Sequence, residues 1–275
     1  MTTPLLPGLY IVATPIGNLG DITLRAIAVL RDVAAVACED TRITGRLLHH
    51  LGFKQRLIRY DDHADDFARE RLLELMAGSA VALVSDAGTP LISDPGFRLV
   101  RAARERGITV TSLPGPSAAI TALTLAGLPS DRFLFAGFLP AKAKARGDVL
   151  AELAQVPASL VFYETGPRLG DSLAAIGTLL PGREVAVARE LTKLFEECRS
   201  GSAEELSAHY AAHPPRGEIV LLIGPPVTQA TNSEDADAML LAELVHAKPS
   251  QAAASVAKRT GIDRKKLYAR ALALK

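Results

Sequence analysis

The stretch Val81–Ala118 constrains the fold of this chain more than any other part of the sequence. The apolar run Val81–Val84 predicts a strand buried on both faces, and Ser85–Pro95 gathers Gly, Pro, Ser, Thr and Asp into a loop. A helical period then ends at Gly107, a second apolar strand follows over Ile108–Leu113, and a Pro-Gly-Pro loop leads into a helix of small residues. This order of strand, loop and helix, repeated twice, is typical of a parallel α/β sheet.

The two loops of this stretch indicate a ligand site. In parallel α/β sheets, ligands bind where loops leave the carboxyl ends of strands. Ser85–Pro95 is also longer than the roughly 2–6 residues of a simple strand-to-helix connection. The alternative is two connections that bind nothing. A third loop, Thr14–Gly20, follows the predicted strand Leu9–Ala13 but has neither G-x-G-x-x-G nor a P-loop, and Asp21 is expected to cap the next helix.

Composition and charge narrow the class of protein. With 275 residues, 48% of them hydrophobic, the chain can form one large or two smaller domains. The net charge of +1 is uneven, since residues 249–275 carry +6 and residues 1–248 carry −5. Two cysteines predict a reduced, cytoplasmic protein, and the lack of a long apolar run or a basic signal start predicts no membrane segment. His209 and His213 lack an acidic partner, so no metal site is expected.

A polar cluster follows the predicted strand Val33–Ala37. Glu39, Asp40 and Arg42 would lie at the carboxyl end of that strand, where they are placed to bind polar groups of a substrate. The alternative is purely structural: Asp40 or Thr41 caps a helix and Arg42 pairs with a carboxylate. The sequence leaves both open.

The second half of the chain repeats the α/β pattern. A boundary at 128–131 precedes the strand Phe133–Phe138, and Ala141–Arg146 is predicted to be a basic loop. Later strands end in polar groups, among them Arg189–Lys193. After a linker, two short helices joined by Thr260-Gly261 predict a helix-turn-helix whose basic second helix binds nucleic acid. The alternative is a helical cap packed on the body.

Several of these segments together resemble the tetrapyrrole methylase superfamily, and more narrowly its ribosomal RNA small subunit methyltransferase I branch. The segments that carry the resemblance are Thr14–Asp21, Thr23–Ala26, Cys38–Arg42, Ser85–Gly96, Leu113–Ala118, Phe138–Pro140, Tyr163-Glu164 and Arg189–Lys193. Porphyrin-ring methylases usually have a G-x-G-P-G-D-like first loop, which Pro15–Asn18 replaces in part here. This difference favours the RNA branch over a tetrapyrrole substrate.

The resemblance implies two α/β domains of the tetrapyrrole methylase type, at 1–128 and 129–226, with a cleft between them and a helical extension at 235–275. It implies S-adenosylmethionine as cofactor and a homodimer as the assembly. The implied reaction is methylation of the ribose 2′-oxygen of a cytidine in the decoding region of 16S ribosomal RNA, within the small ribosomal subunit. No metal and no covalent intermediate are needed. A small-molecule methyltransferase and a ligand-sensing nucleic-acid-binding regulator are the alternatives.

The sequence and the resemblance together give a set of candidate site residues. The candidates for cofactor binding are Pro15, Asp86, Ala87, Gly88, Thr89, Pro90, Ser93, Asp94, Pro95, Ser117, Ala118 and Tyr163. The candidates for catalysis are Glu39, Asp40, Arg42, Glu190 and Lys193, whose alternative role is substrate positioning or pairing at the domain interface. The candidates for RNA binding are Arg264, Lys265, Lys266, Arg270, Lys142 and Lys144.

Overall fold

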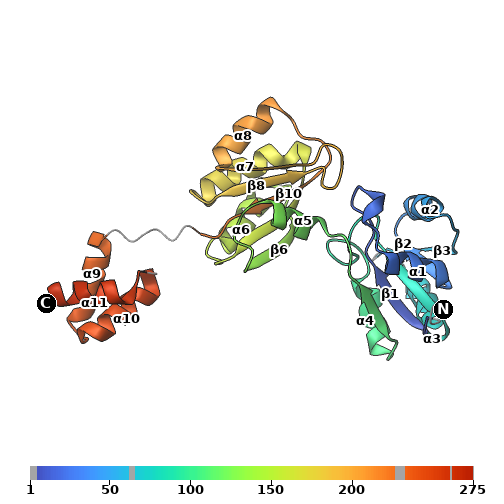
Figure 1. Cartoon of the computed structure of the whole chain (residues 1–275), viewed down its shortest axis with the longest axis horizontal. Helices are drawn as coiled ribbons and strands as arrows, with labels where there is room; N and C mark the ends of the chain where they lie inside the picture. Colours follow the sequence, from blue (N-terminus) through green and yellow to red (C-terminus); the bar gives the residue numbers. More distant parts are fainter. Residues whose placement is uncertain (1–4, 62–65, 227–232, 261, 275) are drawn as a thin grey trace. The chain divides into compact units, whose positions relative to one another are not determined.

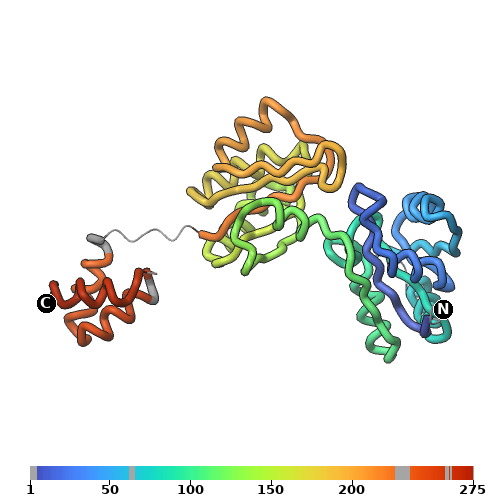
Figure 2. The backbone as a smooth tube through the Cα atoms, in the orientation of Figure 1, coloured from blue at the N-terminus to red at the C-terminus, as the bar shows by residue number. Residues whose placement is uncertain are grey.

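The computed structural model describes residues 5–61, 66–226, 233–260 and 262–274. It consists of two compact units, Met1–Pro225 and Pro226–Lys275 (Figures 1 and 2). Within the described residues, no helix is both long and apolar enough to cross a membrane. The larger unit contains two five-stranded sheets, whose strands lie on either side of the predicted boundary at 128/129. The domain limits themselves stay predictions.

The first sheet is entirely parallel, as the strand-loop-helix pattern predicts. Its strands are β1 (Gly8–Val12), β2 (Ala35–Cys38), β3 (Leu57–Arg59), β4 (Ala80–Val84) and β5 (Val110–Leu113). Their order is β3-β2-β4-β1-β5, so β4 lies at the centre and β3 at one edge. Every residue of β4 is buried, because both faces of this sheet are covered by helices.

The helices of the first half divide between the two faces of the sheet. Apolar residues of α1 (Leu24–Asp32) and α2 (Thr41–His50) pack on one face, and those of α3 (Asp66–Gly78) and α4 (Phe97–Glu105) pack on the other. The predicted cap of the first helix is wrong. Asp21 ends a short 3-10 turn, and the Thr23 hydroxyl caps α1 by accepting a hydrogen bond from the Ala26 amide at 3.1 Å.

The second sheet is mixed rather than parallel. Its strands are β6 (Phe133–Phe138), β7 (Ser159–Thr165), β8 (Val185–Arg189), β9 (Glu197–Gly201) and β10 (Glu218–Ile223), in the order β6-β7-β10-β8-β9. Only the pair β6–β7 is parallel. The sequence did not predict β9, because this polar edge strand, ECRSG, has no apolar run.

Helices cover both faces of the second sheet as well. Apolar residues of α6 (Ala143–Leu153), α7 (Gly166–Leu179) and α8 (Ala203–Ala212) pack on one face, and α5 (Ala118–Leu125) packs on the other. Thus α5 joins the second sheet although the sequence places it in the first half. The predicted basic loop at Ala141–Arg146 is largely the start of α6, where Arg146 is buried and its guanidinium lies 3.5 Å from the Asp171 carboxylate.

The smaller unit is a three-helix assembly of α9 (Ser233–Leu244), α10 (Pro249–Thr260) and α11 (Arg264–Ala273). It has a small apolar core formed by Ala236, Leu240, Ala252, Ala253, Val256, Leu267 and Ala271. These seven residues are buried against one another, whereas Leu241, Tyr268 and Leu272 of the same helices are exposed.

Candidate active site

A cleft lies in the larger unit where loops after β1, β4 and β5 meet residues of the second sheet. We refer to it as the main cleft. It is lined by Ile16, Asp86, Ala87, Gly88, Thr89, Ile92, Ser93, Asp94, Ser117, Ala118, Phe138, Tyr163, Ala188, Glu190, Leu191, Lys193, Glu218, Ile219 and Val220. The first sheet therefore contributes the carboxyl ends of its strands, which is where ligands bind in such sheets.

Two loops of the first sheet are joined by backbone hydrogen bonds. Thr14 and Gly88 exchange them, with N···O distances of 2.8 and 3.0 Å, and the Thr89 hydroxyl donates to the Pro116 carbonyl at 3.0 Å. Gly88 has a φ of +82°, a conformation that favours glycine. Its amide is already used within the protein. Gly88 is one of the candidates for cofactor binding, but its amide is therefore not free to hold a ligand.

Backbone strain is concentrated at the main cleft. Among the described residues, four that are not glycine have a positive φ: Leu91 at 73°, Ser93 at 62°, Glu190 at 50° and Thr192 at 64°. All four belong to the two loops that form opposite walls of the cleft, the loop after β4 and the loop after β8. Such conformations cost free energy and cluster at ligand sites. The strain therefore independently marks the place that the loop composition predicts.

The side of the main cleft formed by the second sheet carries an ion pair, and two glycines leave space for its side chains. The Lys193 ammonium lies 2.9 Å from the Glu190 carboxylate. A Cβ atom at Gly17 would lie 2.7 Å from the Cγ and Cε atoms of Lys193, and one at Gly217 would lie 3.1 Å from Glu190 Oε1. The loop after β1 thus contacts the loop after β8, and the absence of a side chain at Gly17 leaves room for Lys193.

Aromatic side chains form one side of the main cleft. The Tyr163 ring packs edge-on against Phe135 and Phe138, with ring centroids 4.9 and 5.5 Å apart. Burial raises the pKa of the Tyr163 hydroxyl, although a hydrogen bond from the Ala119 amide at the start of α5 acts in the opposite direction. The tyrosine therefore remains a neutral, oriented group at pH 7.

The main cleft is acidic. It is lined by four carboxylates, Asp86, Asp94, Glu190 and Glu218, and by one cation, Lys193. Burial raises the pKa of Asp94 to about 6, and the nearby carboxylates of Glu39, Asp86 and Glu218 add to the shift, whereas a hydrogen bond with Ser85 opposes it. Burial likewise raises the pKa of Asp86. Such a cleft favours a positively charged ligand.

The predicted site residues are only partly brought together. Nine of the twelve cofactor candidates line the main cleft, as do Glu190 and Lys193. Pro15 lines a neighbouring depression, and Pro90 and Pro95 belong to the loop without lining the cleft. The prediction missed Ile16, Ile92, Phe138, Ala188, Leu191, Glu218, Ile219 and Val220 as lining residues. Ile16, Ile92, Phe138 and Leu191 do lie within the segments that carry the family resemblance, although they were not singled out. Ala188, Glu218, Ile219 and Val220 sit on β8 and β10, where nothing in the sequence distinguishes them from other strand residues.

The polar cluster after β2 lies in a second depression, which we call the side pocket. It is lined by Glu39, Asp40, Thr41, Arg42, Arg59 and Asp86, and Asp86 also lines the main cleft. Asp40 caps α2 by accepting from the Arg42 amide at 2.8 Å, and its carboxylate lies 2.6 Å from the Arg42 guanidinium. These hydrogen bonds hold the pKa of Asp40 well below its usual range. The capping alternative is therefore realised, and Asp40 is a weak base.

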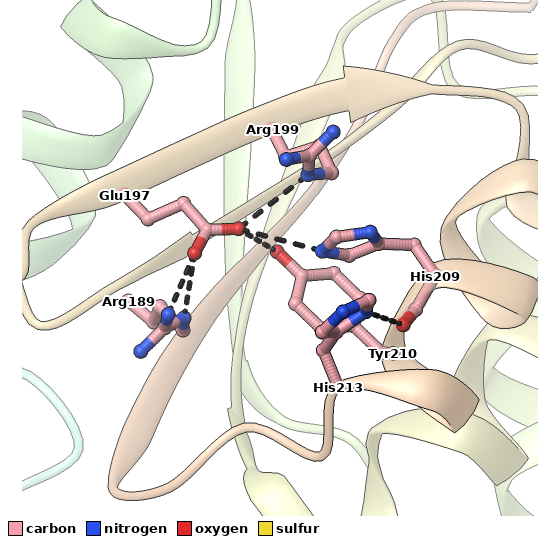
Figure 3. Close-up of polar contacts among 6 residues, drawn as sticks. All are labelled: Arg189, Glu197, Arg199, His209, Tyr210 and His213. Atoms are coloured by element: carbon pink, nitrogen blue, oxygen red, sulfur yellow. Dashed lines mark hydrogen bonds and ion pairs between the residues drawn. The ribbon is translucent and has the colours of Figure 1, made fainter.

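The first residue of Arg189–Lys193 belongs to a different cluster, shown in Figure 3. The Arg189 guanidinium lies 2.6 Å from the Glu197 carboxylate on β9, which also accepts from the Tyr210 hydroxyl at 3.0 Å. Burial opposes ionisation of Glu197, but the bonds from Arg189 and Tyr210 lower its pKa. The expectation that the two histidines lack an acidic partner is wrong for His209, whose Nε2 lies 4.0 Å from the Glu197 carboxylate (Figure 3). His209 also stacks on His213, and no metal-binding cluster occurs among the described residues. The network therefore fixes the β8–β9 hairpin.

The candidates for RNA binding differ in whether a carboxylate of the protein already neutralises their charge. Arg270 is paired with Asp237 at 2.5 Å and Lys144 with Asp148 at 2.8 Å, whereas Lys142 is exposed just before α6. Arg264, Lys265 and Lys266, the α11 cations, are exposed in the first turn of α11. Cations at this end oppose the helix dipole, so they are placed there at a cost in stability. Lys275 and the side chains of Lys258 and Arg259 lie outside the described part of the chain.

Comparison with known proteins assigns the class. The family model described as Tetrapyrrole (Corrin/Porphyrin) Methylases matches residues 8–207, and the chain belongs to this family, which makes it a methyltransferase. A second model, RsmI C-terminal HTH domain, matches residues 230–275. The predicted resemblance and fold class are thus confirmed.

The similar proteins are more specific than the family. One named Ribosomal RNA small subunit methyltransferase I, from Erythrobacter litoralis, is 66% identical over 99% of this chain and 97% of its own length. Another of that name, from Escherichia coli O157:H7, is 49% identical over 96% and 94%. Two solved structures share the fold: a cobalt precorrin-4 methyltransferase (TM-score 0.60, 15% identity, 78% of this chain and 94% of that one) and a diphthine synthase (0.62, 14%, 78% and 89%).

Proposed function

We propose that this protein transfers a methyl group from S-adenosylmethionine to the ribose 2′-oxygen of a cytidine in the decoding region of 16S ribosomal RNA, within the small ribosomal subunit. The observation that carries the proposal is the similarity to small-subunit rRNA methyltransferases over almost the whole chain, the helical unit included. The cytoplasm is the expected location, from the use of only two cysteines, and a homodimer is the expected assembly by family resemblance.

The main cleft suits this cofactor by the chemistry of its lining groups. S-adenosylmethionine supplies an electrophilic methyl group on a positively charged sulfur. The cleft has more carboxylates than cations, which favours the positive charge of the cofactor's sulfur. At the start of α5, Ser117 makes no side-chain cap bond, so backbone amides there can bind the carboxylate of the cofactor. Ile16, Ile92 and Leu191 provide apolar surface for a flat ring. We therefore assign cofactor binding to the main cleft.

The residues of the chain have separate tasks in this proposal. Orientation of the acceptor hydroxyl is the main contribution, since fixed geometry can be worth about 7–11 kcal/mol. Glu190 and Lys193 are the candidates for contact with the hydroxyl and its proton, because both line the main cleft as an ion pair. Asp40 is assigned to positioning, because its low pKa makes it a poor proton acceptor.

The test is methyl transfer from labelled S-adenosylmethionine, with isolated small subunits and naked 16S rRNA as separate substrates. We expect label in RNA, in a 2′-O-methylated cytidine of the decoding region after nuclease digestion and mass spectrometry. Label on a base, or transfer to a porphyrin-like compound but not to RNA, would contradict the proposal. Binding of nucleic acid and cofactor without transfer would favour the regulator instead.

A further inference from the structure

One segment of the larger unit contains basic residues but no acidic ones. Between residues 42 and 59 there are five basic residues and no acidic one, whereas residues 1–225 as a whole hold 23 basic and 25 acidic residues. We refer to Arg42, Arg46, Lys54, Arg56 and Arg59 as the α2–β3 strip. The rest of this unit carries a net negative charge, so any attraction for a polyanion must be local.

The fold places the strip on neighbouring elements at one edge of the first sheet. The residues lie on α2, on the edge strand β3 and on the connection between them, and α2 packs beside β3 (Figure 1). All five side chains belong to exposed residues, while the apolar residues between them, such as Leu47 and Leu48, are buried against the sheet. The helix thus directs its charges outward.

The charge of the strip is only partly neutralised within the protein. Arg42 pairs with Asp40 at 2.6 Å and Arg59 lies 3.7 Å from Asp61. Among the described residues, Arg46, Lys54 and Arg56 have no carboxylate within 4.0 Å. Three uncompensated cations therefore face solvent from an acidic unit.

The strip continues into the proposed active site. In the sheet, Arg59 pairs with Cys38, so it lies at the same edge as Glu39 and Asp40. Arg42 and Arg59 line the side pocket together with Asp86, and Asp86 also lines the main cleft. A chain bound along the strip would therefore reach the reacting position at one end.

We propose that the α2–β3 strip binds the phosphate backbone of the RNA next to the nucleotide that is methylated, an inference that rests on the proposed function. The ten residues of α2 extend about 15 Å, and one strand of a nucleic-acid helix advances about 3.4 Å per nucleotide. A nucleic-acid strand that follows the length of α2 therefore extends over about four nucleotides. Arginine predominates in it, and guanidinium groups match phosphate oxygens in geometry.

The experiment compares the full-length variants Arg46→Ala/Arg56→Ala and Arg98→Ala/Arg104→Ala for binding to naked 16S rRNA and to small subunits over a range of salt concentrations. The control arginines are also exposed and have no ion pair with any residue that the structure describes, but they lie on α4 across the sheet. A phosphate contact on single-stranded RNA contributes about 0.7 to the log–log salt slope. The test variant should thus lose about 1.4 in slope and bind naked rRNA about 25-fold more weakly at 0.1 M salt.

Several outcomes distinguish the possibilities. An Arg46→Lys/Arg56→Lys variant should keep the slope, and all variants should bind S-adenosylmethionine as the wild type does, which shows that they are folded. Equal affinity and slope for the test and control variants on naked rRNA would overturn the inference. Loss of affinity for intact subunits alone would overturn it in favour of an acidic ribosomal protein. Wild-type protein that binds rRNA through the strip but transfers no methyl group would refute the proposed function only.

Discussion

Replacement of Asp94 should stabilise the protein while it impairs the main cleft. The pKa of this carboxyl is raised from 3.8 to about 6 by burial and by neighbouring carboxylates. The native state therefore binds more protons than the unfolded state between these values, and stability falls as pH rises through that window. The full shift corresponds to about 3 kcal/mol. Because Asp94 is only half-buried, solvent screening reduces this to about 1.5 kcal/mol.

The assay is thermal unfolding of Asp94→Asn at pH 4 and pH 7.5. We expect a gain of about 3–6 °C at pH 7.5, from a stabilisation of about 1.5 kcal/mol in a chain of this size, and almost none at pH 4. Asp131→Asn, at an exposed residue outside the cleft, should change neither value. Calorimetry should also show S-adenosylmethionine binding weakened about tenfold, or ~1.4 kcal/mol. A gain that is equal at both pH values, or absent at pH 7.5, would refute the electrostatic reasoning.

Three further predictions concern other parts of the molecule. Gly17→Ala should displace Lys193 and lower kcat about 100-fold without unfolding the protein. The control is Gly78→Ala, whose added Cβ meets open space. An unchanged kcat in the Gly17 variant would exclude a role for the position of Lys193. Asp40→Ala should lower the denaturant midpoint of unfolding, because it removes the cap of α2, while Asp40→Asn keeps the cap and the midpoint. Equal losses in the two variants would contradict the capping role. Removal of Pro226–Lys275, or replacement of the α11 cations by Ala, should weaken RNA binding and reduce its salt slope, while cofactor affinity stays unchanged. A truncated protein that binds small subunits as well as the full chain at every salt concentration would show that the helical unit has another role.

The sequence predicts the first sheet better than the second for a physical reason. Strands such as Val81–Val84 are buried on both faces, so they appear as apolar runs, and their loops carry the turn residues that mark a ligand site. The edge strand β9 is polar and is defined by its partner β8 rather than by its composition. The antiparallel position of β10 between β7 and β8 likewise depends on contacts between distant parts of the chain, and no local sequence pattern predicts it.

The candidate site shows the same limit. Loop residues such as Asp86 and Ser117 could be identified because glycine, proline and short polar residues surround them. Glu218 and Val220 line the cleft only because the second sheet meets the first. Arg146, which the sequence placed in a basic loop, is a buried residue of α6. The basic residues of the α2–β3 strip can be read from the sequence, but their grouping in space depends on the position of β3 at the sheet edge.

The packing of α5 on the second sheet has a mechanical consequence. All strands of the first sheet precede Pro114 and all strands of the second follow α5, so between residues 8 and 223 the chain passes from one sheet to the other once, through 114–117. Two of these residues, Pro114 and Pro116, have a fixed φ, which leaves this connection few soft torsions. Because Ser117 also lines the main cleft, a bound ligand would lie directly against the stiff connection between the two sheets.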